Sequence, residues 1–438
     1  MGSEWQTVRL SDVADTTDYV ANGSFESLRN NVTYRSLPDY AVLVRLVDHN
    51  AGWNGDHVYV DRPSYEFLRK SALRPGDIVI ANVGANAGTV FRAPDLGTRM
   101  TLGPNAILCR PIDERVLRQD FLYYYLTSEA GQQSLRSIRS GSAQPKFNKT
   151  DLRSLRIPLP PLSDQRAIAE TLGSLDDKID LNRRMSDTLE SMARALFKSW
   201  FIDFDPVRSK AEGRDPGLPA PLADLFPSCF DDSELGDIPK GWQVGPLDSV
   251  LVLQRGFDLP SSDRTPGAYP VLAASGPSGT HDTFMARGPG VTTGRSGVLG
   301  NVFYVQEDFW PLNTSLWVKE YRHSLPAYAY HLMRGIPFEL FNAGSAVPTL
   351  NRNHVHGLPT LLPPMALIEE FERIASSGLR RGTGLSEQTN TITAVRDGLL
   401  PKLLEGRLLS TIRGPTLGHV LRTPQTSSGR YADPSRRC

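Results

Sequence analysis

Several features that would assign this sequence of 438 residues to a common class are missing from it. No run approaches eighteen apolar residues, and the first thirty residues lack a charged, apolar and small-residue signal sequence. We therefore expect a cytoplasmic protein without a membrane span. The only cysteines are Cys109, Cys229 and Cys438, and none forms a C-x-x-C pair. They fit a reducing compartment and argue against a disulfide framework and against a structural zinc site.

Motifs for catalysis are also missing. The sequence contains no G-x-x-x-x-G-K-[ST] or G-x-G-x-x-G phosphate loop, no glycine-rich methyl-donor loop after a first strand, and no N-P-P-[YF] or D-P-P-[YF] motif for an extruded adenine. His354 and His356, which a strand would point the same way, have no third metal ligand nearby. Asp203 and Asp205 fit a helix end better than a nuclease carboxylate pair. We expect no catalytic residue, no metal site and no cofactor in this chain.

The net charge is zero, with 48 basic and 48 acidic residues, which by itself argues against a nucleic-acid partner. The charges are nevertheless segregated. Residues 129–156 carry six basic side chains against two acidic ones, whereas residues 206–240 carry four against seven. A run of charge is most often a solvated face, so this segregation alone does not establish DNA binding.

One passage of the sequence occurs twice. Residues 141–161 read GSAQPKFNKTDLRSLRIPLPP and residues 344–364 read GSAVPTLNRNHVHGLPTLLPP, with nine identities in twenty-one positions at a constant shift of 203. The openings EWQTVRLSDV around Trp5 and GWQVGPLDSV around Trp242 are also alike. Self-similarity of this kind predicts two structural repeats.

Each repeat is expected to contain a buried strand, a glycine-rich turn and a second strand. VIANVGANAGTVFR from Val79 aligns without gaps on VTTGRSGVLGNVFY from Val291. Apolar β-branched residues flank clusters of Gly and Asn in both segments, which is typical of hairpins. The shift here is 212, so insertions separate the two repeats.

A long helix is expected after each Pro-Pro pair. Apolar heptad rows run from Ser163 to about Asp203, on the order of 60 Å of helix, and recur 203 positions later. Matching rows of this length predict that the two helices pack against each other. Gly378, Gly382 and Gly384 cost roughly 1 kcal/mol each in a helix, which leaves open a kink or break there. The rows comprise Ile168, Leu175, Asn182, Leu189 and Leu196, with Leu172, Ile179, Ser186, Ala193 and Trp200; then Phe371, Gly378, Leu385, Ile392 and Leu399, with Ala375, Gly382, Thr389, Arg396 and Leu403.

These patterns predict an α/β (mixed α+β) fold with two globular domains in pseudo-two-fold repeat, separated by two long antiparallel packed helices. Such a chain has approximate two-fold symmetry, as the backbones of duplex DNA do, so two domains on a rigid bar could read two DNA segments with a gap between them. The expected boundaries are 1–160 for the first domain, 161–205 for the central helix, 206–240 for an acidic linker, 241–362 for the second domain, 363–408 for the second helix, and 409–438 for a disordered, basic and nonessential tail.

The residues between Leu159 and Trp242 carry a family resemblance. IPLPPLSDQRAIAETLGSLDDKIDL and its continuation to SELGDIPKGW, with the matching LLPPMALIEEFERIA and VRDGLLPKLLEGRL, resemble the specificity subunit of type I restriction-modification systems. The resemblance extends from residue 1 to about 409. It implies a non-catalytic subunit with two target recognition domains, each reading half of a bipartite double-stranded DNA site, and two antiparallel helices that set the gap and carry two methyltransferase subunits.

What the resemblance implies for partners goes beyond this chain. The subunit would direct adenine N6 methylation and, with restriction and translocase subunits, cleavage of DNA. S-adenosylmethionine, ATP and Mg would then be bound by the partner subunits. No membrane partner is implied.

Basic and amide side chains in the predicted loops are the candidate DNA-binding residues, together with serines beside them. Arg and Lys neutralise phosphate, and Asn, Gln and Arg pair with purine edges. Asn148 and Asn351 occupy the same repeat position, so they are expected to hold the loop or contact the DNA backbone. The candidates are Asn82, Asn86, Gln144, Lys146, Asn148 and Lys149 in the first domain, and Arg295, Ser296, Asn313, Ser345, Asn351 and Arg352 in the second.

An alternative function stays open on the sequence alone. Two globular domains on a helical bar could form a scaffold that binds two copies of a protein partner rather than DNA. The basic loop around Lys146 and Lys149 argues against this reading, and a steep salt dependence of binding would distinguish the two, because counterion release accompanies phosphate binding.

Overall fold

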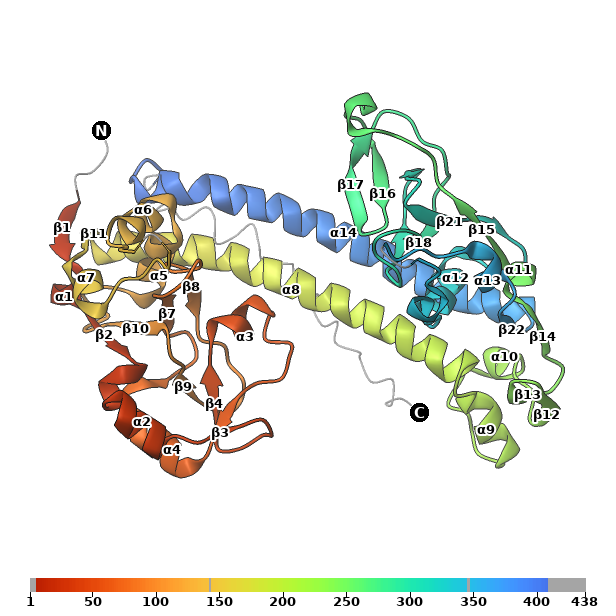
Figure 1. The fold of residues 1–438 in the computed structure, drawn as a ribbon, viewed down its shortest axis with the longest axis horizontal. Helices are drawn as coiled ribbons and strands as arrows, with labels where there is room; N and C mark the ends of the chain where they lie inside the picture. Colours follow the sequence, from red (N-terminus) through yellow and green to blue (C-terminus); the bar gives the residue numbers. More distant parts are fainter. Residues whose placement is uncertain (1–4, 142, 345–346, 409–438) are drawn as a thin grey trace, which may run out of the picture. The chain divides into compact units, whose positions relative to one another are not determined.

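The computed structural model describes residues 5–141, 143–344 and 347–408, which form a mixed α+β chain, as predicted (Figure 1). The chain divides into two compact units, one of Met1–Ile179 with Thr391–Cys438 and one of Asp180–Asn390. The predicted tail, 409–438, lies outside the described residues. Across the described ranges, no helix combines the length and apolarity needed to cross a bilayer.

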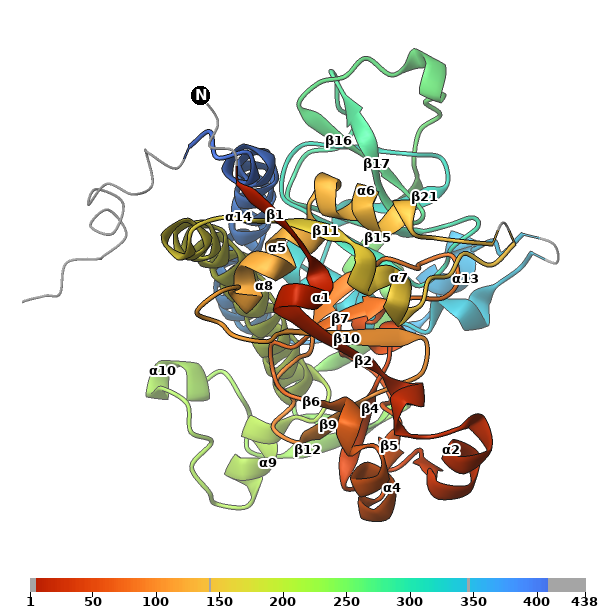
Figure 2. The ribbon, with the colours of Figure 1, turned by 90° about the vertical axis from the view of Figure 1, so that its left-hand side faces the viewer.

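The first unit contains a four-stranded antiparallel sheet in the order β2-β10-β7-β8, of which β2, β10 and β7 lie side by side in Figure 2. Strand β7 is buried on both faces, since Ile78 and Ile80 pack with the helices while Val79 packs with a second, five-stranded sheet, β3-β5-β4-β9-β6. The strands are β2 (Ala14–Asp18), β3 (Tyr34–Arg35), β4 (Ala41–Val44), β5 (Tyr59–Val60), β6 (Ala72–Leu73), β7 (Ile78–Ala81), β8 (Val90–Arg92), β9 (Arg99–Leu102) and β10 (Ala106–Pro111); the helices are α1 (Leu10–Val13), α2 (Phe25–Asn31), α3 (Leu46–Asn50), α4 (Arg62–Phe67), α5 (Gln119–Thr127), α6 (Glu129–Ser137) and α7 (Lys149–Ser154).

The second unit repeats this sheet, with β15-β21-β18-β19 in the corresponding order. The predicted strand, turn and strand are confirmed in both repeats, as β7 with β8 and as β18 with β19. A three-stranded sheet, β17-β16-β20, replaces the five-stranded one. The strands are β15 (Leu251–Arg255), β16 (Tyr269–Ala273), β17 (Gly276–His281), β18 (Gly290–Gly294), β19 (Val302–Val305), β20 (Trp310–Pro311) and β21 (Ser315–Tyr321); the helices are α11 (Leu247–Val250), α12 (Pro326–Arg334) and α13 (Arg352–His356).

Each domain closes on itself through a short strand pair. β1 (Gln6–Arg9) pairs antiparallel with β11 (Arg156–Leu159), and β14 (Gln243–Pro246) pairs in the same way with β22 (Pro359–Leu362). The similar openings of the two repeats therefore pair with the strands that precede the two proline pairs. This arrangement brings the start of each domain to the start of its long helix.

Both long helices are continuous. α8 runs over Leu162–Phe201 and α14 over Met365–Leu404, 40 residues each. The break that the three glycines left open does not occur. At Gly382 the helices pack closely, since an added Cβ would lie 3.3 Å from the Ser186 Oγ, whereas one added at Gly378 would make an ordinary contact, 4.0 Å from the Leu189 carbonyl oxygen. Every residue of the heptad rows is buried or half-buried.

The contacts between the helices show that they run antiparallel. In the second unit, the Asn182 side chain donates a 2.9 Å hydrogen bond to the Gln388 Oε1, and Phe197 packs on Phe371 with ring centroids 5.5 Å apart. Moving forward along α8 therefore corresponds to moving backward along α14. In the first unit, Asp176 of α8 pairs with Arg396 of α14 at 2.8 Å, so the two helices are also in contact there.

Replacing Asn182 by Leu should raise the free energy of unfolding by about 1 kcal/mol. The Asn182 side chain is fully buried and its Oδ1 has no hydrogen-bond partner, whereas Gln388 is exposed and can bond water instead. Urea unfolding of the full chain measures the change, and the exposed Asn390→Leu serves as a control with little effect. A lower stability for Asn182→Leu would mean that its bond to Gln388 outweighs the cost of burying the amide.

The segment predicted as an acidic linker is folded. It contains α9 (Asp205–Ala211), α10 (Ala220–Ala223) and a hairpin of β12 (Phe230–Ser233) with β13 (Gly236–Pro239). Val207, Phe226 and Ile238 are buried in the same core cluster as Trp200. The charge composition of the segment gave no indication of these buried apolar residues, which pack it against the end of α8.

Candidate nucleic-acid interface

In the first domain, the turn between β7 and β8 lies against the repeated basic loop. The Gly84 backbone N–H donates to the Pro145 carbonyl at 2.9 Å, and Lys146 forms bridges with both Val83 and Ser140. We call residues 82–89, 139–141 and 143–149 the first loop cluster. Two segments that the sequence singled out separately therefore form one surface.

The second domain brings together the equivalent segments. The Gly297 N–H donates to the Pro348 carbonyl at 2.9 Å, and the Leu350 N–H donates to the Arg295 carbonyl at 2.8 Å. We call residues 294–301, 338–344 and 347–352 the second loop cluster. The repeated passage is thus the partner of the repeated turn in both domains.

Some of the first-domain candidates have side chains that are already engaged. Asn82 donates from Nδ2 to the Phe147 carbonyl at 2.9 Å, and the Lys149 ammonium pairs with Asp18 at 2.8 Å. Asn86, Gln144 and Lys146 are exposed, and no side-chain hydrogen bond or ion pair within the described part of the chain engages them. These three remain available to a ligand.

Asn148 and Asn351 both act as helix N-caps. The Asn148 Oδ1 accepts a 3.0 Å hydrogen bond from the Asp151 N–H at the start of α7, and the Asn351 Oδ1 accepts one of 3.0 Å from the Asn353 N–H at the start of α13. Their shared repeat position therefore has a local structural reason, because a side-chain oxygen satisfies a free N–H of the first helical turn.

The second-domain candidates also differ in availability. Arg295 donates from Nη1 to the Asn313 carbonyl at 3.2 Å, and the Asn313 amide donates to Asp258. The backbone of Ser296 forms an antiparallel β-bridge with that of Thr349. Arg352 is exposed at the first position of α13. Ser345 lies outside the described residues.

Sequence reasoning missed two charged residues of the clusters. Arg139 lies over Gly88 of the first turn, and Glu339 of the 3-10 helix at Phe338–Phe341 lies over Gly300 of the second. No motif marks either residue, since each reaches the turn only through the folding of the chain around its sheet.

The structure also places the histidine and aspartate pairs that the sequence singled out. No group of three or more His, Cys, Asp or Glu side chains in the described ranges could hold a metal ion. The two histidines expected on a strand lie on helix α13 instead, and His356 accepts a 2.9 Å hydrogen bond from the Leu253 N–H. Asp203 pairs with Lys198 at the end of α8.

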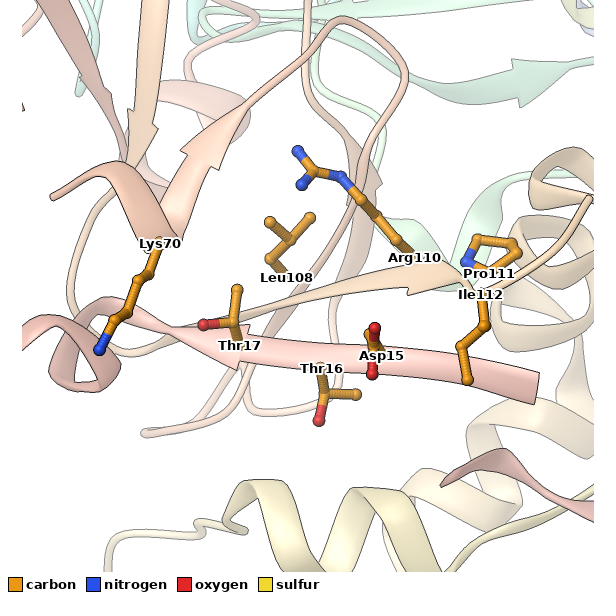
Figure 3. A pocket seen from close by; sticks show the side chains of 8 residues that line it. All are labelled: Asp15, Thr16, Thr17, Lys70, Leu108, Arg110, Pro111 and Ile112. Atoms are coloured by element: carbon orange, nitrogen blue, oxygen red, sulfur yellow. The ribbon is translucent and has the colours of Figure 1, made fainter. Parts of the chain in front are cut away.

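A pocket of about 350 Å³ opens beside β2 and β10 of the first domain, separate from the candidate residues (Figure 3). Its cationic side chains have internal partners, since Arg110 pairs with Asp77 and Lys70 donates to the Ala21 carbonyl at 3.2 Å. The lining residues are Asp15, Thr16, Thr17, Lys70, Leu108, Arg110, Pro111 and Ile112.

Each domain is anchored to a long helix within its own unit. In the first, Gln165 of α8 accepts a 2.8 Å hydrogen bond from the Arg118 N–H at the start of α5. In the second, the Glu372 carboxylate of α14 accepts from the N–H groups of Ala327 and Tyr328 at 2.8 and 3.1 Å, at the start of α12, and burial raises its pKa. In each unit, a polar side chain of a long helix therefore holds the first turn of a helix of the domain.

Comparison with known proteins agrees with this organisation. Residues 2–191 match the family model described as type I restriction modification DNA specificity domain. The chain is 21% identical over 316 residues, 66% of its length, to the type I restriction enzyme MjaIX specificity subunit of Methanocaldococcus jannaschii, covering 69% of that protein. It is also similar to the HindI specificity subunit of Haemophilus influenzae, with 34% identity over 166 residues. This match covers 36% of the present chain and 34% of that protein.

A solved structure shares the fold. The crystal structure of a type I restriction-modification S subunit from M. genitalium superposes with a TM-score of 0.63, covering 91% of this chain and 96% of that one at 16% sequence identity. The resemblance to specificity subunits and the predicted fold class are therefore confirmed.

Proposed function

Because residues 2–191 of this chain belong to the type I restriction modification DNA specificity domain family, we propose that the chain is the DNA-recognition subunit of such a system. Each domain reads one half of a bipartite double-stranded site through its loop cluster. The observation that carries this proposal is the pair of equivalent loop clusters, one in each repeat, on equivalent sheets. A duplicated surface suits a ligand with two similar segments.

In this proposal the chemistry lies with partner subunits. Methyltransferase subunits, one for each repeat, would bind S-adenosylmethionine and methylate adenine N6, and restriction subunits would use ATP and Mg to translocate and cleave DNA. Met192 of α8 and Val395 of α14 occupy equivalent repeat positions and are 63% and 47% exposed.

Binding to duplex DNA tests this function against the two-headed protein scaffold. The full chain assembled with its methyltransferase partner should bind a duplex that carries its methylated motif, and the affinity should fall steeply between about 50 and 200 mM salt. Sequencing of methylated bases in host cells identifies the motif. A complex whose binding to DNA is independent of sequence and salt would favour the scaffold.

A domain exchange tests the division between the repeats. Replacing residues 1–160 with the equivalent domain of a relative should change one half of the methylated motif and leave the other half intact, because each loop cluster is built within one unit. The methylated motif of cells that express the hybrid is the measurement. A change in both halves would contradict independent reading by the two domains.

A further inference from the structure

The two loop clusters differ in charge at one equivalent place. Gly88 and Gly300 occupy the same position of the repeated turn and both have positive φ, 95° and 85°. A Cβ added at Gly88 would collide with the Arg139 guanidinium, and one added at Gly300 would collide with the Glu339 carboxylate. A cation therefore covers the turn in the first domain, and an anion covers it in the second.

The cation of the first domain has no acidic partner. Among residues 5–141, 143–344 and 347–408, no carboxylate pairs with Arg139, and its Nε is buried without a hydrogen-bond acceptor. Lys146 is exposed across the same turn, bridged to Val83 and Ser140. Two cations on one loop cluster, neither paired with a carboxylate of the described residues, make a surface suited to phosphate.

The anion of the second domain has apolar neighbours. Leu340 is 79% exposed beside Glu339, and Val298 and Val347 of the same cluster are 40% and 53% exposed. Gly297 and Pro348, which hydrogen-bond at 2.9 Å, hold these two valines on adjacent segments. A carboxylate and apolar side chains cannot neutralise a phosphate, so this part of the cluster is suited to a different contact.

On the basis of the proposed function, we propose that the turns contact DNA in two different ways. Arg139 binds a backbone phosphate of the half-site read by the first domain. Glu339 accepts a hydrogen bond from the exocyclic amino group of a base, such as cytosine N4, in the half-site read by the second. Carboxylates pair with base amino groups in the major groove, and apolar side chains contact the edges of neighbouring bases such as the thymine methyl.

Phosphate and base contacts have distinct consequences for binding. A lost phosphate contact weakens binding to all sequences alike and lowers the slope of log affinity against log salt by about 1. A lost base contact removes discrimination at one base pair and leaves the salt slope unchanged. Arg139→Gln should therefore weaken binding about threefold to tenfold for cognate and altered duplexes alike.

Glu339→Ala should lower discrimination at one base pair of the second half-site about tenfold, with an unchanged salt slope. The measurement is the dissociation constant of the full chain with its methyltransferase partner, at several salt concentrations, for the methylated motif and for duplexes altered at each position. Matched controls are Arg136→Gln, whose guanidinium pairs with Glu129, and Glu320→Gln on β21, whose carboxylate pairs with Arg322. Both controls should bind like the wild type.

Other outcomes overturn the inference. If Glu339→Ala strengthens binding to every duplex, the carboxylate only repels phosphate. If it alters neither discrimination nor affinity, Glu339 does not contact DNA, and an unchanged salt slope for Arg139→Gln excludes the phosphate contact. A wild-type complex without preference for its own motif would instead contradict the proposed function.

Discussion

Inserting four residues after Arg183 in α8 and four after Ser386 in α14 should lengthen the gap between the two proposed half-sites by one or two base pairs, if the packed helices set that gap. Four residues add about 6 Å of helix, and one base pair occupies about 3.4 Å of duplex. Each added base pair also rotates the half-sites by about 34°, which favours the smaller change. Both half-sites should stay the same, and the methylated motif of the variant is the measurement.

The choice of positions follows from the antiparallel contacts. Arg183 and Ser386 are related by the repeat shift of 203, and they also lie opposite each other, since Asn182 bonds Gln388 and Gly382 faces Ser186. Inserts placed there preserve the pairing on both sides. Four residues introduce a stutter but keep the apolar rows facing.

Insertion sites chosen by the repeat alone would fail. Leu175 and Gly378 are also equivalent in the repeat, but Gly378 lies opposite Leu189, so the helices between two such inserts would slip by about one turn. An insert in α8 alone has the same defect and should impair assembly. Seven residues in both helices, a full heptad, should lengthen the gap by about three base pairs. An active paired insert with an unchanged gap would contradict the idea that the packed helices set the gap between the half-sites.

Acidification from pH 7 to pH 4 should destabilise the second unit through His331. The pKa of this histidine is lowered from its ordinary 6.5 to about 4, mainly by burial among aromatic rings and also by the nearby Arg334 and Arg194, while Glu190 acts in the opposite direction. Its ring packs against Phe197, and its Nε2 has no hydrogen-bond partner. The folded state therefore takes up this proton less readily than the unfolded state.

Because the pKa of His331 is lower in the folded state than in the unfolded state, acidification lowers the stability. Above pH 6.5 the imidazole is neutral in both states and its contribution to stability is complete. Between about pH 6.5 and pH 4 the unfolded state binds the proton and the folded state does not, so stability falls, by about 3 kcal/mol in total at 1.36 kcal/mol per pH unit. Below pH 4 both states are protonated and the loss stops.

Replacement of His331 by Phe should remove this part of the pH dependence. Urea unfolding of the full chain between pH 4 and 7 measures it, and the quantity of interest is the difference between wild type and variant at each pH. His331→Leu repeats the test with another apolar side chain, and His354→Phe, at an exposed position of α13, should keep the wild-type profile. If His331→Phe and wild type lose the same stability on acidification, the histidine is not the source.

Local patterns were sufficient for much of the fold. Each strand, turn and strand around Val79 and Val291 was predicted from apolar residues that flank glycine and asparagine, and both long helices from heptad rows, because these signals depend on residues a few positions apart. The shift of 203 predicted the repeat, and the repeat implied equivalent domains. None of these inferences needed a contact between distant segments.

Other features depended on contacts between residues far apart in the sequence. Gly378 and Gly382 have a cost in helix propensity, yet α14 is unbroken, and at Gly382 the lack of a side chain allows close packing against Ser186 of α8. The acidic segment after α8 is folded because a few buried apolar residues outweigh its charged composition.

The sequence by itself determined the duplicated architecture, the two long helices and the family resemblance, since short-range periodicity and repetition specify them. Only the tertiary structure decided which candidate side chains are available. Lys149 is paired with Asp18 across 131 positions of sequence, and Arg139 and Glu339 reach the glycine turns through the folding of each sheet. Residue type predicts which ligands a side chain can bind. The contacts of that side chain in the folded protein determine whether it is free to bind them.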